Sequence, residues 1–486
     1  MITGYKHGTY GEIDRSVSKL PQNSDAVAVY VGTAPVNLVK GHEANINMPV
    51  QLFDLESAKR AVGYSDDFAK FTLCEAIKAH FDNPVGNVGP IIVINVLDPS
   101  KHKKSMQTTK SLTFVNKRAV IDGDTIVLDS LVLADKVVNV DYTVDYDFTK
   151  KQVILTDIST EGISGSINAT YDEVDTTQVK AEDVIGDATA AGVYTGLGAL
   201  GLVYTELNKV PTIVAAPGWS DTKAVYEAMV KATTKINGHW DAYVVADIPV
   251  KSTDTIDKAL EFKTNNGYNV ERSKVCWPQG QDRFGKIYHA STAYVWSMLQ
   301  VDGSHGGVPM ETPSNKETFL VKQYFGEGST NKGFDQMTAN RLNASGVSTF
   351  CYWGGRWALW GPHGAAYEYG KVTDNRTIFD NSMRMLMYIS NQFQIDHALQ
   401  IDSPMNRAMV DTILNAEQAK LDALVAKGAL IGSPVIFFKE SENSTTQLVE
   451  GDFVWGFEGT PAPPLKSATL RVAYSDEGFS SFFGEV

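Results

Sequence analysis

The chain has 486 residues, 43% of them apolar and 10% aromatic, with a formal net charge of −14 at pH 7. This length is too great for one compact core, so we expect about two to four domains. The composition excludes a disordered chain. The acidic charge argues against nucleic acid as a partner, because phosphate binding needs clustered Lys and Arg.

The N-terminal sequence lacks the pattern of a signal peptide, and no run approaches the roughly 18 apolar residues of a membrane span. Cys74, Cys276 and Cys351 lie far apart in apolar surroundings. Their odd number and spacing predict reduced, buried thiols in a protein made in a cytoplasm. The nine histidines show no ligand spacing, so we expect no metal and no other cofactor.

The first elements indicate a parallel α/β layer. Residues 1–23 hold few apolar anchors and end in a turn-rich hinge. Residues 26–31 and 90–97 are continuous apolar runs, typical of strands buried on both faces. Between them we expect a short helix over 55–62 and a longer amphipathic helix from Asp67.

Residues 106–176 follow a different pattern, with alternating segments and turn signals but no helical period. Residues 117–127 predict a hairpin in which Asp122 and Gly123 supply the turn. Further strands are expected over 140–146, 152–155 and 166–171. Together these segments predict a small β-sandwich inserted in the α/β domain, whose two ends must lie close together.

The α/β pattern resumes after Ala181 with a helix over 192–208, and Ser220 is predicted to cap a later helix. The remaining core elements are expected to be strand 212–216, strand 242–247, helix 254–266, strand 273–277, helix 290–300 and strand 347–353. The closing region predicts helices over 378–400 and 405–427, and strands over 434–439, 447–457 and 467–474.

Several motifs in this order resemble those of contractile-tail sheath proteins. They are the segment Thr195-Gly-Leu-Gly-Ala-Leu-Gly201 with the strand to Ala216-Pro-Gly218, then Asp241-Ala-Tyr-Val-Val-Ala-Asp-Ile-Pro249, Lys274-Val-Cys-Trp-Pro-Gln279, Pro313-Ser-Asn-Lys-Glu317, and Leu342-Asn-Ala-Ser-Gly-Val-Ser-Thr-Phe350 leading into Gly354-Gly-Arg-Trp-Ala-Leu-Trp-Gly361. The resemblance covers most of residues 20–100 and 180–486. One departure is Trp360-Gly-Pro-His-Gly364, where many relatives carry a basic run.

The resemblance implies an α/β fold with a subtilisin-like parallel-sheet core. It also implies a structural subunit that polymerises around an inner tail tube and contracts to drive the tube through a cell envelope. The implied partners are other copies in six-subunit rings stacked as a helix, the tube protein, and baseplate and tail terminator proteins. We expect assembly in the bacterial host cytoplasm, into a virion tail or a released R-type bacteriocin. A type VI secretion or extracellular injection sheath is the alternative.

On this interpretation the chain divides into five parts. They are an N-terminal arm (1–24), a discontinuous α/β core (25–104 and 177–361), an inserted β-sandwich (105–176), an α+β C-terminal domain (362–466) and a C-terminal arm (467–486). A free terminal strand has unpaired N–H and C=O groups and can pair with another chain. The resemblance implies that both arms add strands to a neighbour's C-terminal sheet.

The residues expected to take part in this strand exchange are Ile2, Tyr5, Tyr10, Ile13, Leu470, Val472, Tyr474, Phe479, Phe482 and Phe483. The segments near 21–24 and 461–465 are expected to act as hinges. The inner tube is expected along the polar face of helix 405–427, at Arg407, Asp411, Lys420 and Lys427.

Two enzyme classes are the more distant alternatives. Gly196, Gly198 and Gly201 spell G-x-G-x-x-G, but no clear strand precedes them, which argues against a dinucleotide site. The segment 302–307 is similar to the His-Gly element of subtilases, but no serine turn follows His305, so a hydrolase would lack its nucleophile. We therefore assign no catalytic residue.

Overall fold

The computed structural model describes residues 22–23 and 26–484. Its central feature is an eight-stranded sheet in the order β19-β18-β14-β13-β12-β2-β5-β3. The strands are β2 (Ala28–Gly32), β3 (Pro49–Leu52), β5 (Ile91–Asn95), β12 (Ile213–Ala215), β13 (Tyr243–Asp247), β14 (Ser273–Cys276), β18 (Val347–Trp353) and β19 (Arg356–Trp360). The edge strands β3 and β19 run antiparallel to their neighbours, and the strands between them are parallel.

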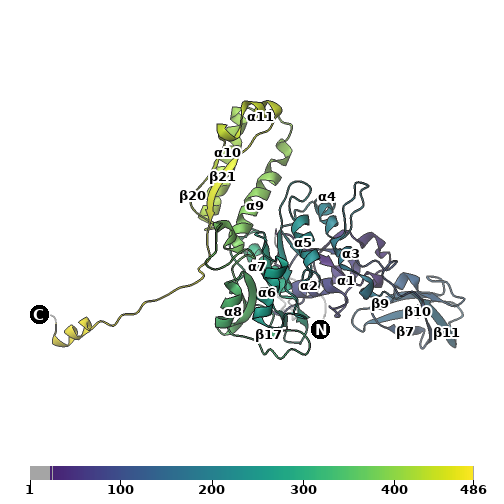
Figure 1. Ribbon diagram of the computed structural model, residues 1–486. Coiled ribbons are helices and arrows are strands. Elements are labelled where there is room, and N and C mark those ends of the chain that lie inside the picture. Colours follow the sequence, from purple (N-terminus) through teal and green to yellow (C-terminus); the bar gives the residue numbers. More distant parts are fainter. Residues whose placement is uncertain (1–21, 24–25, 485–486) are drawn as a thin grey trace, which may run out of the picture.

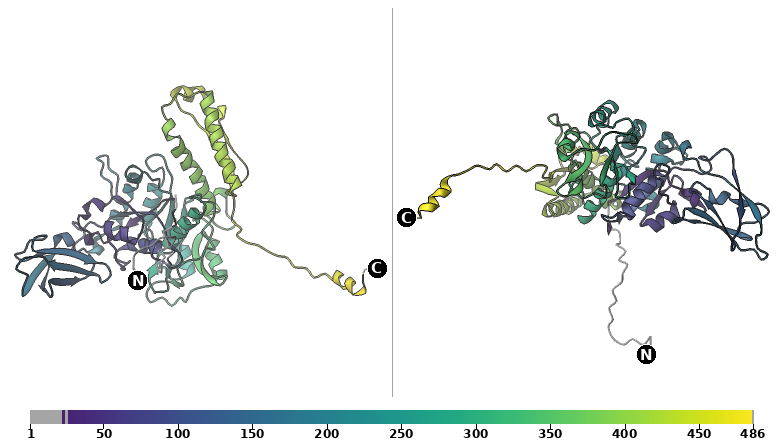
Figure 2. Two further views of the ribbon diagram at one scale, coloured as in Figure 1. Left: turned by 180° about the vertical axis from the view of Figure 1, so that it is seen from behind. Right: turned by 90° about the horizontal axis from the view of Figure 1, so that it is seen from below.

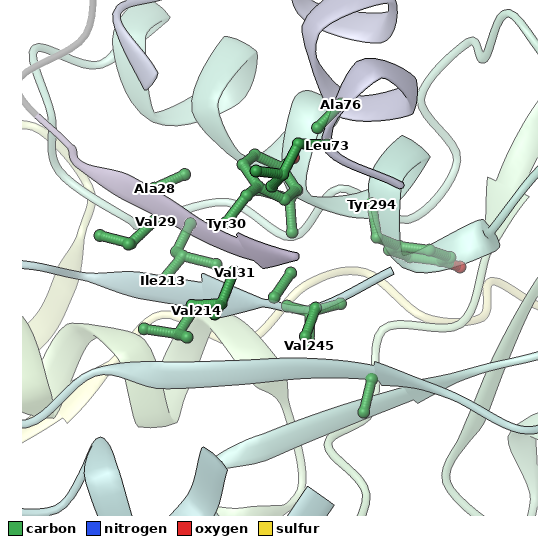
Figure 3. Packing of buried hydrophobic residues seen from close by; sticks show 14 of the residues in the cluster. Ala28, Val29, Tyr30, Val31, Leu73, Ala76, Ile213, Val214, Val245 and Tyr294 are labelled. Atoms are coloured by element: carbon green, nitrogen blue, oxygen red, sulfur yellow. The ribbon is translucent and has the colours of Figure 1, made fainter. Parts of the chain in front are cut away.

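Helices cover this sheet, so its central strands are buried on both faces. The helices are α1 (Leu55–Ala61), α2 (Thr72–Phe81), α3 (Ala181–Ile185), α4 (Leu202–Leu207), α5 (Lys223–Ala232), α6 (Ile256–Asn266), α7 (Ala290–Ser304) and α8 (Gln336–Asn343). Successive residues Val29, Tyr30 and Val31 are fully buried (Figure 3). Helices α2 and α7 pack against each other and against the sheet. None of the described helices is long and apolar enough to cross a membrane.

Strands β2 and β12 are neighbours in the sheet, but the chain leaves them in opposite directions. After β2 it forms β3 and β5 on one side, and after β12 it forms β13 on the other. Such a reversal leaves a crevice at the carboxyl ends of these two strands. The prediction of a mixed α/β fold containing a parallel sheet is confirmed. Two small sheets accompany it: β1 (Gln22–Asn23) with β4 (Val88–Gly89), and β15 (Gln279–Gln281) with β16 (Ile287–Tyr288) and β17 (Lys322–Tyr324).

Residues 108–171 form two three-stranded antiparallel sheets, β7-β10-β9 and β6-β11-β8. The strands are β6 (Thr108–Thr113), β7 (Arg118–Asp122), β8 (Val132–Leu133), β9 (Tyr142–Asp147), β10 (Gln152–Asp157) and β11 (Ser166–Tyr171). Their inward residues, including Tyr142, Val153 and Leu155, form a hydrophobic cluster separate from that of the main sheet. These sheets extend to one side of the body (Figure 1).

The hairpin predicted over 117–127 is wrong. Strand β7 pairs with β10, in a register that joins Asp122 to Gln152, while Ile126 forms a bridge with Glu173. The tight turn lies earlier, at Asn116 and Lys117, which both have positive φ angles. Strand β7 forms a continuous antiparallel ladder with β10. The residues after Gly123 contact the main body instead.

The C-terminal region contains α9 (Asp380–His397), α10 (Arg407–Ala426), β20 (Leu430–Phe437), α11 (Thr445–Glu450) and β21 (Gly456–Pro461). Helices α9 and α10 extend from the body, with α11 at their far end (Figure 1). Strands β20 and β21 form a two-stranded antiparallel sheet that packs on these helices. Met383 and Met387 face the main core, whereas Met385 belongs to the C-terminal cluster, so these methionines pack on two sides of α9.

Four further element predictions need correction. The helix expected over 192–208 is a 3-10 turn at Gly196–Gly201 followed by the short α4, and the helix expected from Asp67 begins at Thr72. Ser220 does not cap α5; its hydroxyl accepts the backbone N–H of Asp247. The strand expected over 447–457 instead begins with the last residues of α11, whose capping box joins Ser444 and Gln447, and β21 starts only at Gly456.

Candidate assembly interface

The C-terminal segment after β21 leaves the body of the protein (Figures 1 and 2). The Ala462 N–H donates to the Ala429 carbonyl and the Ala462 carbonyl accepts from Asn381, each at 3.0 Å. Residues 464–467 then line a cavity on the body. Residues 467–474, predicted as a strand, have an extended course but pair with no strand in the described part of the chain. We call residues 467–484, the described part of the predicted arm, the C-terminal arm.

Apolar side chains of the C-terminal arm are strongly exposed. Leu470, Val472 and Tyr474 are 83–86% exposed. Because they are spaced by two residues, they lie on one face of an extended chain. Burying each such side chain is worth roughly 1.5–3 kcal/mol. An arm with this pattern has a strong tendency to bind another surface.

The arm ends in the 3-10 helix η9 (Glu477–Phe483). Its side chains Phe479, Phe482 and Phe483 are 55–87% exposed, and the rings of Phe479 and Phe482 lie 5.9 Å apart. The six C-terminal strand-exchange residues of the sequence prediction therefore all lie on the exposed arm. Ile2, Tyr5, Tyr10 and Ile13 lie outside the described residues.

Strands β20 and β21 form a sheet whose outer edges are unpaired within the described part of the chain. A bulge between Ile431 and Val435 interrupts the register, and both of these side chains are partly exposed. Helices α9 and α10 pack against this sheet. Open edges present unpaired N–H and C=O groups to an incoming strand.

Helix α9 is fixed to the main body by two buried ion pairs, one to the sheet and one to α7. The Lys274 ammonium of β14 lies 2.7 Å from the Asp380 carboxylate of α9, and both side chains are fully buried. The Arg384 guanidinium of α9 pairs with Asp302 of α7. Burial raises the pKa of Asp302, and the charge of Arg384 opposes that shift. Sequence reasoning missed both pairs.

The four residues predicted to meet the tube divide between two sides of α10. Arg407 pairs with Asp411 at 2.7 Å. Lys420 pairs with Asp396 of α9 and Glu417, and it lines the groove between the two helices together with Lys427. At 100° per residue, Lys420 and Lys427 lie roughly opposite Arg407 and Asp411. The expected single polar face does not bring these four side chains together.

The glycine-rich segment has a packing role. A Cβ atom on Gly196 would lie 2.3 Å from the Val184 carbonyl oxygen, and one on Gly198 would lie 2.2 Å from that of Asp187. These glycines let the chain at 195–198 pack against the backbone at 184–188. The backbone N–H of Gly196 donates to the Asn47 side chain at 2.9 Å. Close backbone packing therefore explains the glycines without a phosphate ligand.

A charged cluster that the sequence did not indicate lies at the carboxyl edge of the sheet. The Glu75 carboxylate accepts from the His289 backbone N–H at 2.6 Å and lies 2.8 Å from its ring Nδ1. Burial alone would lower the pKa of His289, but the charge and hydrogen bond of Glu75 outweigh it and raise the pKa to about 10.

The nearby Ser291 hydroxyl donates to Asp247 rather than to this histidine. His305, at the end of α7, lies 3.0 Å from Glu311. Among the described residues, neither histidine has a serine hydroxyl as a hydrogen-bond partner, as a Ser-His triad requires.

One group of possible metal ligands, His42, Glu43 and Asp129, has ligand atoms within 4.8 Å of one another. The His42 Nδ1 atom, however, already lies 3.2 Å from the Val39 carbonyl and 3.3 Å from Asp129. An Nδ1–H that donates to these oxygens leaves only Nε2 with a lone pair for an ion.

An exposed apolar arm together with open sheet edges is typical of a subunit that assembles with other chains. Comparison with known proteins identifies relatives of this chain. The chain is 27% identical to the tail sheath protein of Burkholderia phage BcepMu over 98% of both chains, and 24% identical to that of Escherichia phage P2 over 61% of this chain and 71% of that protein. No family model matches the chain.

The fold is similar to that of a subunit in the contracted sheath complex of an extracellular contractile injection system, with a TM-score of 0.56 and 12% identity over 98% of this chain and 99% of that one. The resemblance predicted from the sequence is thereby confirmed. These relatives are tail sheath proteins, and the function that the comparisons support is that of a structural subunit of a contractile sheath.

Proposed function

We propose that copies of this chain form six-subunit rings, stacked as a helix around an inner tail tube, and that their contraction drives the tube through a target envelope. The observation that carries this proposal is the C-terminal arm, whose apolar side chains are exposed and whose extended backbone has no strand partner in the described chain. If the arm pairs with β20 or β21 of a neighbouring subunit, its backbone gains a strand partner and its apolar side chains become buried.

In this proposal the body moves as a unit and the arms absorb the motion. The two buried ion pairs at Lys274 and Arg384 hold α9 on the sheet, so bending is confined to the hinge segment near 461–465. Nucleotide hydrolysis is not needed in this proposal, because contraction forms contacts between subunits that are absent in the assembled, extended sheath. The formation of these contacts supplies the energy. Burial of ~300 Å² more apolar surface per subunit would supply at most about 7 kcal/mol at ~25 cal/mol/Å².

The tube protein, the baseplate and a tail terminator are the other proposed partners, and the bacterial cytoplasm is the proposed place of assembly. The domain layout of the sequence prediction, with arms at 1–24 and 467–486 and a subtilisin-like core, is also part of this proposal. A phage tail is preferred over a type VI secretion sheath because a curated relative that matches this chain along nearly all its length is a phage protein. Co-purification of a second, complementary sheath protein would reverse that preference.

The test is electron microscopy of the overexpressed protein. Full-length chains should form long hollow sleeves. Chains lacking residues 1–20, or lacking residues 467–486, should remain folded and stay as single subunits. Normal sleeves from either truncated chain would reject the arm model.

A further inference from the structure

The end of the arm differs chemically from its middle. Residues 470–474 have the alternating pattern of a strand, whereas η9 gathers three phenylalanines on a single helical turn. Pairing of a strand with β20 or β21 would bury one side of residues 470–474 and leave η9 without a site. The rings of Phe482 and Phe483 are 79% and 87% exposed, so their burial requires an apolar recess on another surface.

Such a recess runs along α9, and we call it the α9 groove. It consists of two adjoining cavities of about 350 and 380 Å³ that share Tyr388 and Gln392. The first lies between α9 and the amino end of the main sheet, with Tyr204, Met387 and Ile395 in its wall. The second lies between α9 and α10, with Val308, Ile389, Leu421 and Leu424 in its wall.

Two lysines of the α9 groove can pair with the carboxylates of η9. Asp476 and Glu477 place two carboxylates at the start of η9. The carboxylates of the groove are matched within the body: Asp241 by Arg272, Asp302 by Arg384, and Asp396 and Glu417 by Lys420. Lys209 and Lys427 line the two cavities and have no carboxylate partner within 4.0 Å in the described part of the chain. These two ammonium groups can therefore pair with the carboxylates of η9.

The arm is long enough to bring η9 to another subunit. At ~3.3 Å per residue, the extended stretch 462–476 reaches up to about 50 Å from its exit beside α9. In the structure this stretch leads away from its own groove (Figures 1 and 2).

We propose that the α9 groove of one subunit receives η9 of a second copy of this chain, with the phenylalanines in the apolar recess and Asp476 and Glu477 beside its lysines. This inference rests on the proposed function, because the second copy comes from the sheath. The arm then makes two attachments to neighbouring subunits: a strand that fixes its register and an aromatic plug that resists its withdrawal.

The test uses photo-cross-linking in the full-length chain. Phe482 is replaced by benzoylphenylalanine, isotopically heavy and light chains are mixed before assembly, and the cross-linked peptides are mapped by mass spectrometry. We expect heavy–light cross-links from position 482 to residues of α9 and α10 that wall the groove. Cross-links confined to β20 and β21, to other surfaces, or within one chain would overturn the proposal.

Two matched substitutions complete the test. Ile395→Asp places a charge in the groove at a side chain that is 42% exposed, so folding should be preserved. It should reduce the groove cross-link about tenfold, whereas Ile401→Asp, on the nearby turn and outside the groove, should leave it unchanged. Equal effects of the two substitutions would count against the groove. If the unaltered protein forms no sleeves, the proposed function itself fails; sleeves with cross-links elsewhere overturn only this inference.

Discussion

At the scale of single residues, the junction between the main sheet and the C-terminal helices depends on ionic partners that are far apart in the sequence. Lys274 and Asp380 are 106 residues apart, and Asp302 and Arg384 are 82 apart. Nothing in the local pattern of the sequence indicates such pairs, because only the tertiary fold brings them together. The arm residues could be predicted, since an apolar strand pattern close to a chain end is visible in the sequence itself.

The buried pair at Lys274 should be sensitive to loss of its carboxylate. Asp380→Ala would leave the ammonium buried with only the carbonyl oxygens of Gly361 and His363 as partners. Removing one partner of a buried pair costs about 3–5 kcal/mol. We expect a fall of that size in the free energy of unfolding, measured by urea denaturation of assembly-deficient subunits.

The matched control is Asp411→Ala, which breaks the exposed pair with Arg407 on α10. An exposed pair is worth about 0–1 kcal/mol. If the two substitutions lower stability equally, the buried pair does not fix α9 to the sheet.

His289 predicts a loss of stability at alkaline pH. Its pKa in the folded protein is raised to about 10 from an ordinary value of 6.5. The folded state therefore holds the proton more tightly, and this contribution is complete below pH 6.5 and lost as pH rises through 10. The melting temperature should fall between pH 7 and 10, and His289→Gln should flatten that fall. If the melting temperature of His289→Gln falls as steeply with pH as that of the unaltered protein, the fall is due to other titratable groups.

At the scale of elements, mainly apolar runs located the parallel strands to within a few residues, because burial on both faces favours apolar residues. The wrong element predictions lie where a local sequence pattern is compatible with two different structures. Leu448 and Val449 suggested a strand, but Ser444 and Gln447 form a capping box that starts α11. That spacing of serine and glutamine was a usable signal. The pairing of β7 with β10 was not predictable from the Asp122–Gly123 turn, because the partner strand lies beyond β9.

The strand character of the C-terminal arm can be tested with proline. Val472→Pro removes a backbone N–H and so disrupts a ladder at that point. Because Val472 is exposed on an arm clear of the body, the melting temperature of the single subunit should not change. Sleeve formation should be strongly reduced, as measured by sedimentation and electron microscopy. Ser467→Pro, nearer the hinge, is the control and should assemble normally; normal sleeves from Val472→Pro would argue against strand pairing.

At the scale of the whole molecule, the β region forms a separate unit because the chain enters and leaves it at neighbouring points. The β region at 108–171 is entered and left at adjacent points: Lys103 bridges Val174, and the N–H of Lys104 donates to the Glu173 carbonyl at 2.9 Å. Sequence reasoning anticipated close ends for an inserted unit. It did not anticipate how the unit is held, because the contacts come from the loop after β2 and from the segment before α2.

Those contacts decide what should happen when the β region is removed. The buried Asn37 side chain donates to the carbonyls of Asp124 and Ile126, both at 3.0 Å, and the Ser65 hydroxyl donates to Asp124. A chain in which a short linker replaces residues 106–176 loses these acceptors, and water must satisfy the freed groups. An unsatisfied buried polar group costs about 1–3 kcal/mol, so we expect a small fall in the melting temperature and a chain that still folds.

The same deletion tests the outer position of the β region. The region extends sideways from the body, away from both the C-terminal arm and the β20–β21 sheet (Figures 1 and 2), so the proposed assembly contacts do not depend on it. Sleeves should therefore form from the shortened chain, with a smaller outer diameter and an unchanged bore in electron micrographs. Complete loss of sleeves from chains that remain folded would place the β region between subunits, because only a part that joins neighbours can abolish assembly without unfolding its own subunit.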